Sequence, residues 1–216
     1  MKKTLFVVGA GKGLGNAVAR MFAEHDFRVV LMCRNAERLT EYRNALRAQG
    51  MDVETQVADA ADQSALAASL REAVQRYGVP DVLFYNVGTT TADADLAENM
   101  NAEIMRQRYA GDVLGAYTCI QEMNCEAFRQ KQGAVLITGG GLSLYPSADY
   151  LPLSMDKAAL RAMVLALHPV LKEQGIYLGS VQVCGLIGGS EKYMPDNIAE
   201  LFWNLYQGRS EIEIVY

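Results

Sequence analysis

A tyrosine and a lysine seven residues apart, Tyr150 and Lys157, are the side chains of this chain best suited to chemistry. A phenol can give or take a proton, and a nearby ammonium group lowers its pKa from the usual value of about 10. On a helix, seven residues return to nearly the same face with a rise of about 10 Å, so both side chains could contact one extended ligand but not each other. Pro152 is typical of a first helical turn, which leaves Tyr150 just outside the helix and its direction open.

A glycine-rich turn near the N-terminus is suited to binding phosphate. The turn has the spacing GxxxGxG and leads from an apolar run straight into a segment of helical period. A strand, a glycine turn and a helix in this order point backbone N–H groups and the positive helix end at a pyrophosphate. We therefore expect dinucleotide binding by the residues of this turn, Gly9, Gly11, Lys12, Gly13, Leu14 and Gly15.

Short apolar runs alternate with segments of helical period along the whole chain. The runs predict strands at residues 5–8, 28–32, 53–57, 82–85, 134–138, 176–183 and 212–215. The periodic segments predict helices at residues 14–25, 36–48, 62–77, 101–130, 153–173 and 197–207. A barrel of eight strand–helix units needs about 250 residues, so the alternation predicts a doubly wound Rossmann-type α/β fold. We expect one domain over residues 1–216, with about seven mostly parallel strands flanked by helices.

Composition and charge exclude several classes of protein. The net charge of −5 gives no support to a nucleic-acid-binding surface, and no apolar stretch approaches the roughly 18 residues that span a bilayer. Four scattered cysteines without a CxxC pattern indicate reduced thiols and not a metal site. We expect a cytoplasmic protein that acts on a small-molecule substrate, without nucleic acid, membrane or metal.

The GxxxGxG spacing is that of short-chain dehydrogenases/reductases, and the chain resembles this family over nearly its full length. The resemblance implies cofactor contacts at Asp59, Asn86, Val87, Gly88, Lys157 and Ile187. Asp59 stands where the family contacts adenine, and the segment 85–88 stands where the family lines the ribose side of the cofactor. Lys157 would hold the nicotinamide ribose, and the backbone of Ile187 would meet the carboxamide.

The residues at the end of the second expected strand indicate which dinucleotide binds. An acidic residue there would bind the ribose 2′-OH of NAD, but this chain has Cys33 and Arg34. Lys12 adds a second positive charge next to the same ribose, and a guanidinium group is suited to phosphate. This pattern favours NADP(H) over NAD(H), although both side chains could also be ordinary surface charges.

The catalytic residues of the family are largely replaced. Family members transfer hydride between the nicotinamide and a carbonyl, with a tyrosine four residues before the lysine as proton donor. Here that position is Leu153, the usual serine position is Gly140, and the usual asparagine position is Asp112. Leucine cannot donate a proton, so we do not expect carbonyl reduction by the usual four residues. Ser143 could reach the site only if the glycine loop were rearranged, and we expect it to serve a loop turn.

Two classes of function stay open. In the first, the protein is an NADP(H)-dependent oxidoreductase that uses Tyr150 and Lys157 on a carbonyl or an activated alkene. The Tyr-x6-Lys spacing resembles that of enoyl reductases, but the GxxxGxG pattern argues against that resemblance, and the short segment 188–195 would hold a long acyl arm poorly. In the second, it is a catalytically inactive NADP(H)-binding sensor or partner subunit. We also expect a reduced substrate lid and, from the resemblance, a homodimer or homotetramer formed by the helices at 101–130 and 153–173.

Overall fold

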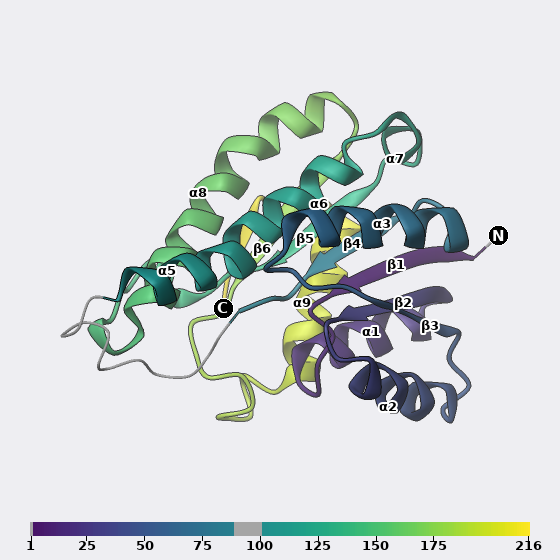
Figure 1. Ribbon diagram of the computed structural model, residues 1–216, viewed down its shortest axis with the longest axis horizontal. Helices are drawn as coiled ribbons and strands as arrows, with labels where there is room; N and C mark the ends of the chain where they lie inside the picture. The colour runs from purple at the N-terminus through teal and green to yellow at the C-terminus, as the bar shows by residue number, and fades with distance from the viewer. Residues whose placement is uncertain (1, 89–100) are drawn as a thin grey trace.

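The computed structural model describes residues 2–88 and 101–216, which form a parallel sheet with helices on both faces (Figure 1). The seven strands lie in the order β3-β2-β1-β4-β5-β6-β7, and each described pair is parallel. Their bounds are β1 Lys3–Val8, β2 Phe27–Cys33, β3 Val53–Val57, β4 Val82–Tyr85, β5 Ala134–Thr138, β6 Tyr177–Gln182 and β7 Glu213–Val215. The strand order reverses between β1 and β4, where doubly wound sheets bind ligands. The predicted Rossmann-type fold is confirmed.

The helices form two layers, one on each face of the sheet (Figure 1). One face is covered by α1 Leu14–Glu24, α2 Ala36–Arg47 and α9 Pro195–Gly208. The other is covered by α3 Gln63–Tyr77, α5 Ala102–Tyr109, α6 Gly115–Met123, α7 Glu126–Gln130 and α8 Leu151–Glu173. Alternate residues of β1 enter different cores, since Leu5 packs with α1 and α9 whereas Phe6 packs with α3 and α6. Among the described helices, none has the length and apolar character that crossing a bilayer requires.

The prediction of one continuous helix over 101–130 is wrong. The helix is interrupted by a π-helical turn at Ala110–Leu114 and ends at Met123, before the short α7. A π turn leaves backbone carbonyls without their usual helical partners, and side chains from outside the helix take them here. The Gln63 amide donates to the carbonyl oxygen of Ala110 at 2.8 Å, and the buried hydroxyl of Tyr85 donates to that of Gly111. This turn fixes the position of Asp112.

The segment between β6 and α9 forms a short ordered turn in place of a long lid. The rings of Tyr193 and Tyr216 pack edge to face with centroids 5.6 Å apart, and the Lys192 ammonium lies over both. The hydroxyl of Tyr216 also donates to the carbonyl oxygen of Lys192 at 2.8 Å. A Cβ at Gly185 would collide with the Tyr193 ring, so this position requires glycine. The short segment that we expected as a reduced lid therefore packs against Tyr216.

Candidate functional site

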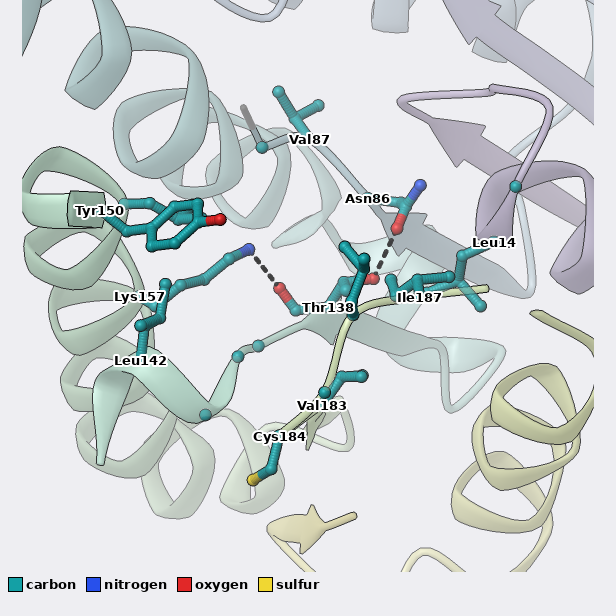
Figure 2. A pocket seen from close by; sticks show the side chains of 18 of the residues that line it. Leu14, Asn86, Val87, Thr138, Leu142, Tyr150, Lys157, Val183, Cys184 and Ile187 are labelled. Carbon is teal, nitrogen blue, oxygen red and sulfur yellow. Dashed lines mark hydrogen bonds between the residues drawn. The ribbon is translucent and has the colours of Figure 1, made fainter. Parts of the chain in front are cut away.

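A cavity of about 570 Å³ opens at the carboxyl ends of the central strands. Its walls come from the start of α1, the segments that follow β4, β5 and β6, and the first turns of α8. Figure 2 shows Tyr150 and Lys157 entering it from the α8 side, opposite Leu14 and Ile187. Cavities of this size bind small molecules and cofactors in many proteins. The cavity is the candidate functional site.

Most of the residues expected from the sequence lie together in this cavity. Those that line it are Gly13, Leu14, Asn86, Val87, Gly88, Tyr150, Lys157 and Ile187. The others lie outside its lining, namely Gly9, Gly11, Lys12, Gly15, Arg34 and Asp59. Arg34 directly follows β2, and Asp59 lies two residues after the end of β3. These strands lie on the β1 side of the sheet in the order β3-β2-β1, and the N–H of Gly9 donates to the carbonyl oxygen of Met32 at 2.9 Å. The expected residues outside the lining therefore lie along the same edge of the sheet as the cavity.

The four glycines of the N-terminal turn divide into two pairs. Gly9 has φ +90°, and a Cβ there would collide with the backbone carbonyl of Asn86. A Cβ at Gly15 would lie 2.8 Å from the carbonyl oxygen of Gly9. A Cβ at Gly11 or Gly13, in contrast, would have no described atom within 4 Å. The first pair is required for packing, and the second borders open space where a phosphate group fits.

The start of α1 is suited to an anion. No side chain among the described residues caps this helix, in contrast to α2 and α3, whose first turns are capped by Asn35 and Asp62. Uncapped N–H groups at the start of a helix can bind an anion from outside the chain. The turn and α1 therefore fit a dinucleotide pyrophosphate.

A chain of hydrogen bonds connects the glycine turn to Lys157 across the ends of three strands. The Asn86 amide donates to the carbonyl oxygen of Gly9 at 3.1 Å, and the Thr138 hydroxyl donates to the amide oxygen of Asn86 at 2.9 Å. The Lys157 ammonium donates to the carbonyl oxygen of Thr138 at 2.8 Å. Figure 2 shows the last two of these bonds as dashed lines. Sequence analysis missed Thr138, which is the last residue of β5 and lines the cavity at the carboxyl end of that strand.

Buried charges surround Lys157. Burial lowers the pKa of its ammonium group, while the carboxylates of Asp112 and Asp156 act in the opposite direction. A Cβ at Gly88 would lie 3.4 Å from the Lys157 Nζ and 3.7 Å from an Asp112 carboxylate oxygen, so both groups border one small space. Asp156 was missed in the sequence. The available signal was an acidic residue in the buried stripe of a helix, three residues after Leu153 and four before Leu160.

Tyr150 occupies the N-cap position of α8, which begins two residues earlier than expected. Pro152 lies in the first turn of this helix, and Tyr150 is half-buried against the cavity. The direction that the sequence left open is therefore toward the cavity, where Tyr150 and Lys157 lie on the same side (Figure 2).

The positions of the usual serine and tyrosine carry no proton donor. Leu153 is buried and presents an alkyl side chain to the cavity. Gly140 lies against Lys157, and its N–H donates to the Gln182 side-chain oxygen at 3.0 Å. The Ser143 hydroxyl donates to the same oxygen at 3.2 Å and lies outside the cavity lining. Ser143 therefore serves the loop, as expected, through a buried Gln182 that sequence analysis missed.

The outer half of the cavity is apolar. Leu186 and Tyr145 are 72% and 75% exposed at its mouth, and Leu142 and Cys184 lie nearby in the wall. Apart from Lys157, the described residues of the lining carry no charged side chain. Within residues 2–88 and 101–216, no group of three or more His, Cys, Asp or Glu side chains could hold a metal ion. The arrangement suits an uncharged ligand beside a dinucleotide.

Comparison with known proteins finds relatives in sequence. A family model described as short chain dehydrogenase matches residues 3–191. A curated relative, the "ketoacyl reductase 1" of the granaticin polyketide synthase from Streptomyces violaceoruber, is 29% identical over 215 residues, covering 97% of this chain and 76% of the relative.

Solved structures of similar fold cover nearly the whole chain. The L-sorbose reductase of Gluconobacter frateurii, complexed with NADPH and L-sorbose, has a TM-score of 0.89 and 18% identity, covering 100% of this chain and 95% of that one. The alcohol dehydrogenase of Thermococcus sibiricus, complexed with 5-hydroxy-NADP, has a TM-score of 0.86 and 20% identity, covering 99% and 95%. At this level of identity, these likenesses show the fold.

Proposed function

The chain belongs to the short-chain dehydrogenase family of oxidoreductases, and on that premise we propose that it is an NADP(H)-dependent oxidoreductase with a divergent active site. Its substrate is a small, uncharged molecule that carries a carbonyl or an activated alkene. The observation that carries the proposal is the joint presence of Tyr150 and Lys157 in one cavity with Gly13, at the end of the glycine turn. Both a proton donor and a cofactor-binding cation are then available although Leu153 occupies the usual tyrosine position.

The residues of this cavity divide the chemistry between them. A bound nicotinamide would supply a hydride to the substrate carbon. The Tyr150 hydroxyl gives its proton to the oxygen on which negative charge develops, and the Lys157 ammonium holds the nicotinamide ribose in place. The buried alkyl side chain of Leu153 excludes water from the reacting atoms. An enolate or phenolate product is less basic than an alkoxide, so a substrate of this kind needs less help from a strong acid.

The proposed preference for NADP(H) rests on two exposed cations. Arg34 follows β2 and Lys12 lies in the glycine turn, both near the end of the sheet where the adenosine ribose of a dinucleotide would lie. The described segment from Arg34 to Ala36 has no acidic side chain to repel a 2′-phosphate. Asp59, half-buried after β3, is proposed to contact the adenine.

A second function is favoured by one observation, the alkyl side chain of Leu153. If Tyr150 does not act as a proton donor, the protein is an NADP(H)-binding sensor or partner subunit without turnover. Purified protein is incubated with NADPH and a panel of enones, quinones and enoyl thioesters, and the absorbance of NADPH is followed. Substrate-dependent oxidation of NADPH is expected. Tight NADPH binding without turnover on the whole panel would instead support the sensor.

We further propose that residues 1–216 act as one cytoplasmic domain that forms a homodimer or homotetramer. Exposed apolar side chains lie on α5, the π turn, α6 and α8, within the two segments expected at the interface. They are Tyr109, Leu114, Tyr117, Met155, Leu165 and Val170. Sedimentation of the purified protein gives the oligomer number, and a monomer would contradict this part of the proposal.

A further inference from the structure

A buried carboxyl group lies next to Lys157 and has no role in the chemistry proposed above. Asp156 is 2% exposed, and its Oδ2 atom has no hydrogen-bond partner within the described part of the chain. A buried carboxylate without a full set of hydrogen bonds is unfavourable, whereas the protonated carboxyl is tolerated. Asp156 is therefore suited to hold a proton.

The charged groups around Asp156 come from three elements. Asp112 from the π turn and Arg108 from α5 act on it electrostatically, as does its neighbour Lys157 on α8. The other segments packed on this end of α8 contribute little charge, since Gly141–Ser143 has no titratable side chain and Ala148–Tyr150 adds the exposed Asp149 and the half-buried Tyr150. On β6, the Tyr177 hydroxyl is bound to the carbonyl oxygen of Glu211. The group thus contains two carboxyls and two cations.

This charge balance changes by one unit when Asp156 takes up a proton. With Asp156 ionised, the negative charges of the two carboxylates balance the positive charges of Lys157 and Arg108. With Asp156 neutral, the group carries one net positive charge beside the cavity. An anionic dinucleotide is attracted more strongly in the second state, because the charge lies in a region of low dielectric constant.

We propose that Asp156 is a proton-binding positioning residue whose protonation strengthens binding of the phosphorylated dinucleotide beside Lys157. This inference rests on the proposed function, since it requires that NADPH binds in the cavity. Burial and the neighbouring Asp112 raise the pKa of Asp156 to about 7, which brings the change into the physiological range. Asp156→Asn mimics the protonated state at every pH.

The experiment measures the dissociation constant of NADPH by fluorescence titration at pH 6.5 and pH 8.5. We compare the wild type with Asp156→Asn, and use Asp149→Asn as a control that removes an exposed carboxylate from the turn just before the same helix. The ratio of the wild-type constant to that of Asp156→Asn is expected to be near one at pH 6.5 and about three to ten at pH 8.5. Asp149→Asn is expected to follow the wild type at both values.

The possible outcomes separate this inference from the proposed function. If NADPH binds but the ratio is the same at both pH values, the inference is overturned and the proposed function stands. If the wild type does not bind NADPH at either pH, both are overturned. A carbon-13 NMR titration of the wild-type carboxyl groups tests the inference without a variant. A buried aspartate that titrates near pH 7 supports it, and titration of every aspartate near pH 4 would overturn it.

Discussion

The ammonium group of Lys157 and the carbonyl oxygen of Thr138 are joined by a 2.8 Å hydrogen bond that ties α8 to the end of β5. The hydroxyl of Thr138 in turn donates to the side-chain oxygen of Asn86, and the Asn86 amide donates to the carbonyl oxygen of Gly9 in the glycine turn. The position of the lysine is therefore set by the sheet and does not depend on a tyrosine one turn away. This explains how Lys157 can keep its place in the cavity although position 153 is a leucine.

Replacing this lysine tests its assignment to the cofactor. Lys157→Met keeps the length of the side chain but removes its charge, so NADPH affinity is expected to fall about tenfold or more, as for other hydrogen bonds to charged groups. Lys172→Met, an exposed lysine at the other end of α8, is the control and is expected to bind as the wild type does. Equal affinity in the two variants would contradict the assignment.

The glycine turn allows packing and ligand binding to be separated. Gly9→Ala is expected to lower the free energy of unfolding by about 2 kcal/mol or more, because of its positive φ and the collision with Asn86. Gly11→Ala, whose Cβ would enter open space, is expected to unfold as the wild type does but to bind NADPH weakly. Chemical denaturation and fluorescence titration of both variants check this. Normal NADPH binding by Gly11→Ala would argue against a phosphate site at the turn.

Arg34 is expected to discriminate between the two dinucleotides. Arg34→Ala removes a guanidinium from the proposed 2′-phosphate site and should weaken NADPH binding about tenfold, with little effect on NADH. Arg76→Ala, in the last turn of α3, removes a similar charge elsewhere. The measurement is the ratio of the two dissociation constants for each variant. A parallel loss of NADH and NADPH binding in Arg34→Ala would refute the specificity role.

Protonation of Asp156 should also appear in the stability of the protein. Its carboxyl binds a proton more tightly in the folded state than in the unfolded state, where the pKa is near the usual aspartate value of 3.8. The stabilisation from this proton is therefore complete below pH 3.8 and is lost as the pH rises through about 7. Asp156→Asn is expected to unfold at a higher temperature than the wild type at pH 8.5, by about 2–4 °C for each kcal/mol.

The same pair of proteins should approach equal stability as the pH falls. Thermal unfolding at pH 5.5, 7 and 8.5 measures the difference. A difference that is constant with pH would mean that Asp156 does not titrate in this range.

Elements whose signal lies within one segment could be predicted from the sequence. The apolar run 5–8 predicts β1, and the spacing of Gly9, Gly13 and Gly15 predicts a tight turn between a strand and a helix. The π turn at Ala110–Leu114 could not be predicted, because it depends on Tyr85 and Gln63 from other elements. The sequence of residues 101–130 alone has a continuous helical pattern, because the side chains of Tyr85 and Gln63 lie outside it.

The cofactor side of the site was more accessible to sequence analysis than the substrate side. Asn86 directly follows β4 and Ile187 lies in the segment after β6, so the fold brings both to one edge of the sheet. The direction of Tyr150 depends on the packing at the start of α8, and the exposed Tyr145 and Leu186 reach the mouth of the cavity through loops. Loop positions of this kind follow from tertiary contacts and leave no periodic signal.

The role of Tyr150 as proton donor is tested by the turnover of Tyr150→Phe on any substrate that the wild type reduces with NADPH. Loss of the phenolic proton should lower kcat/KM by about 100-fold or more, while NADPH affinity stays within about twofold of the wild type. Tyr145→Phe, which alters an exposed tyrosine of the same cavity, should retain its activity. A Tyr150→Phe enzyme as active as the wild type would contradict the claim that Tyr150 is the proton donor.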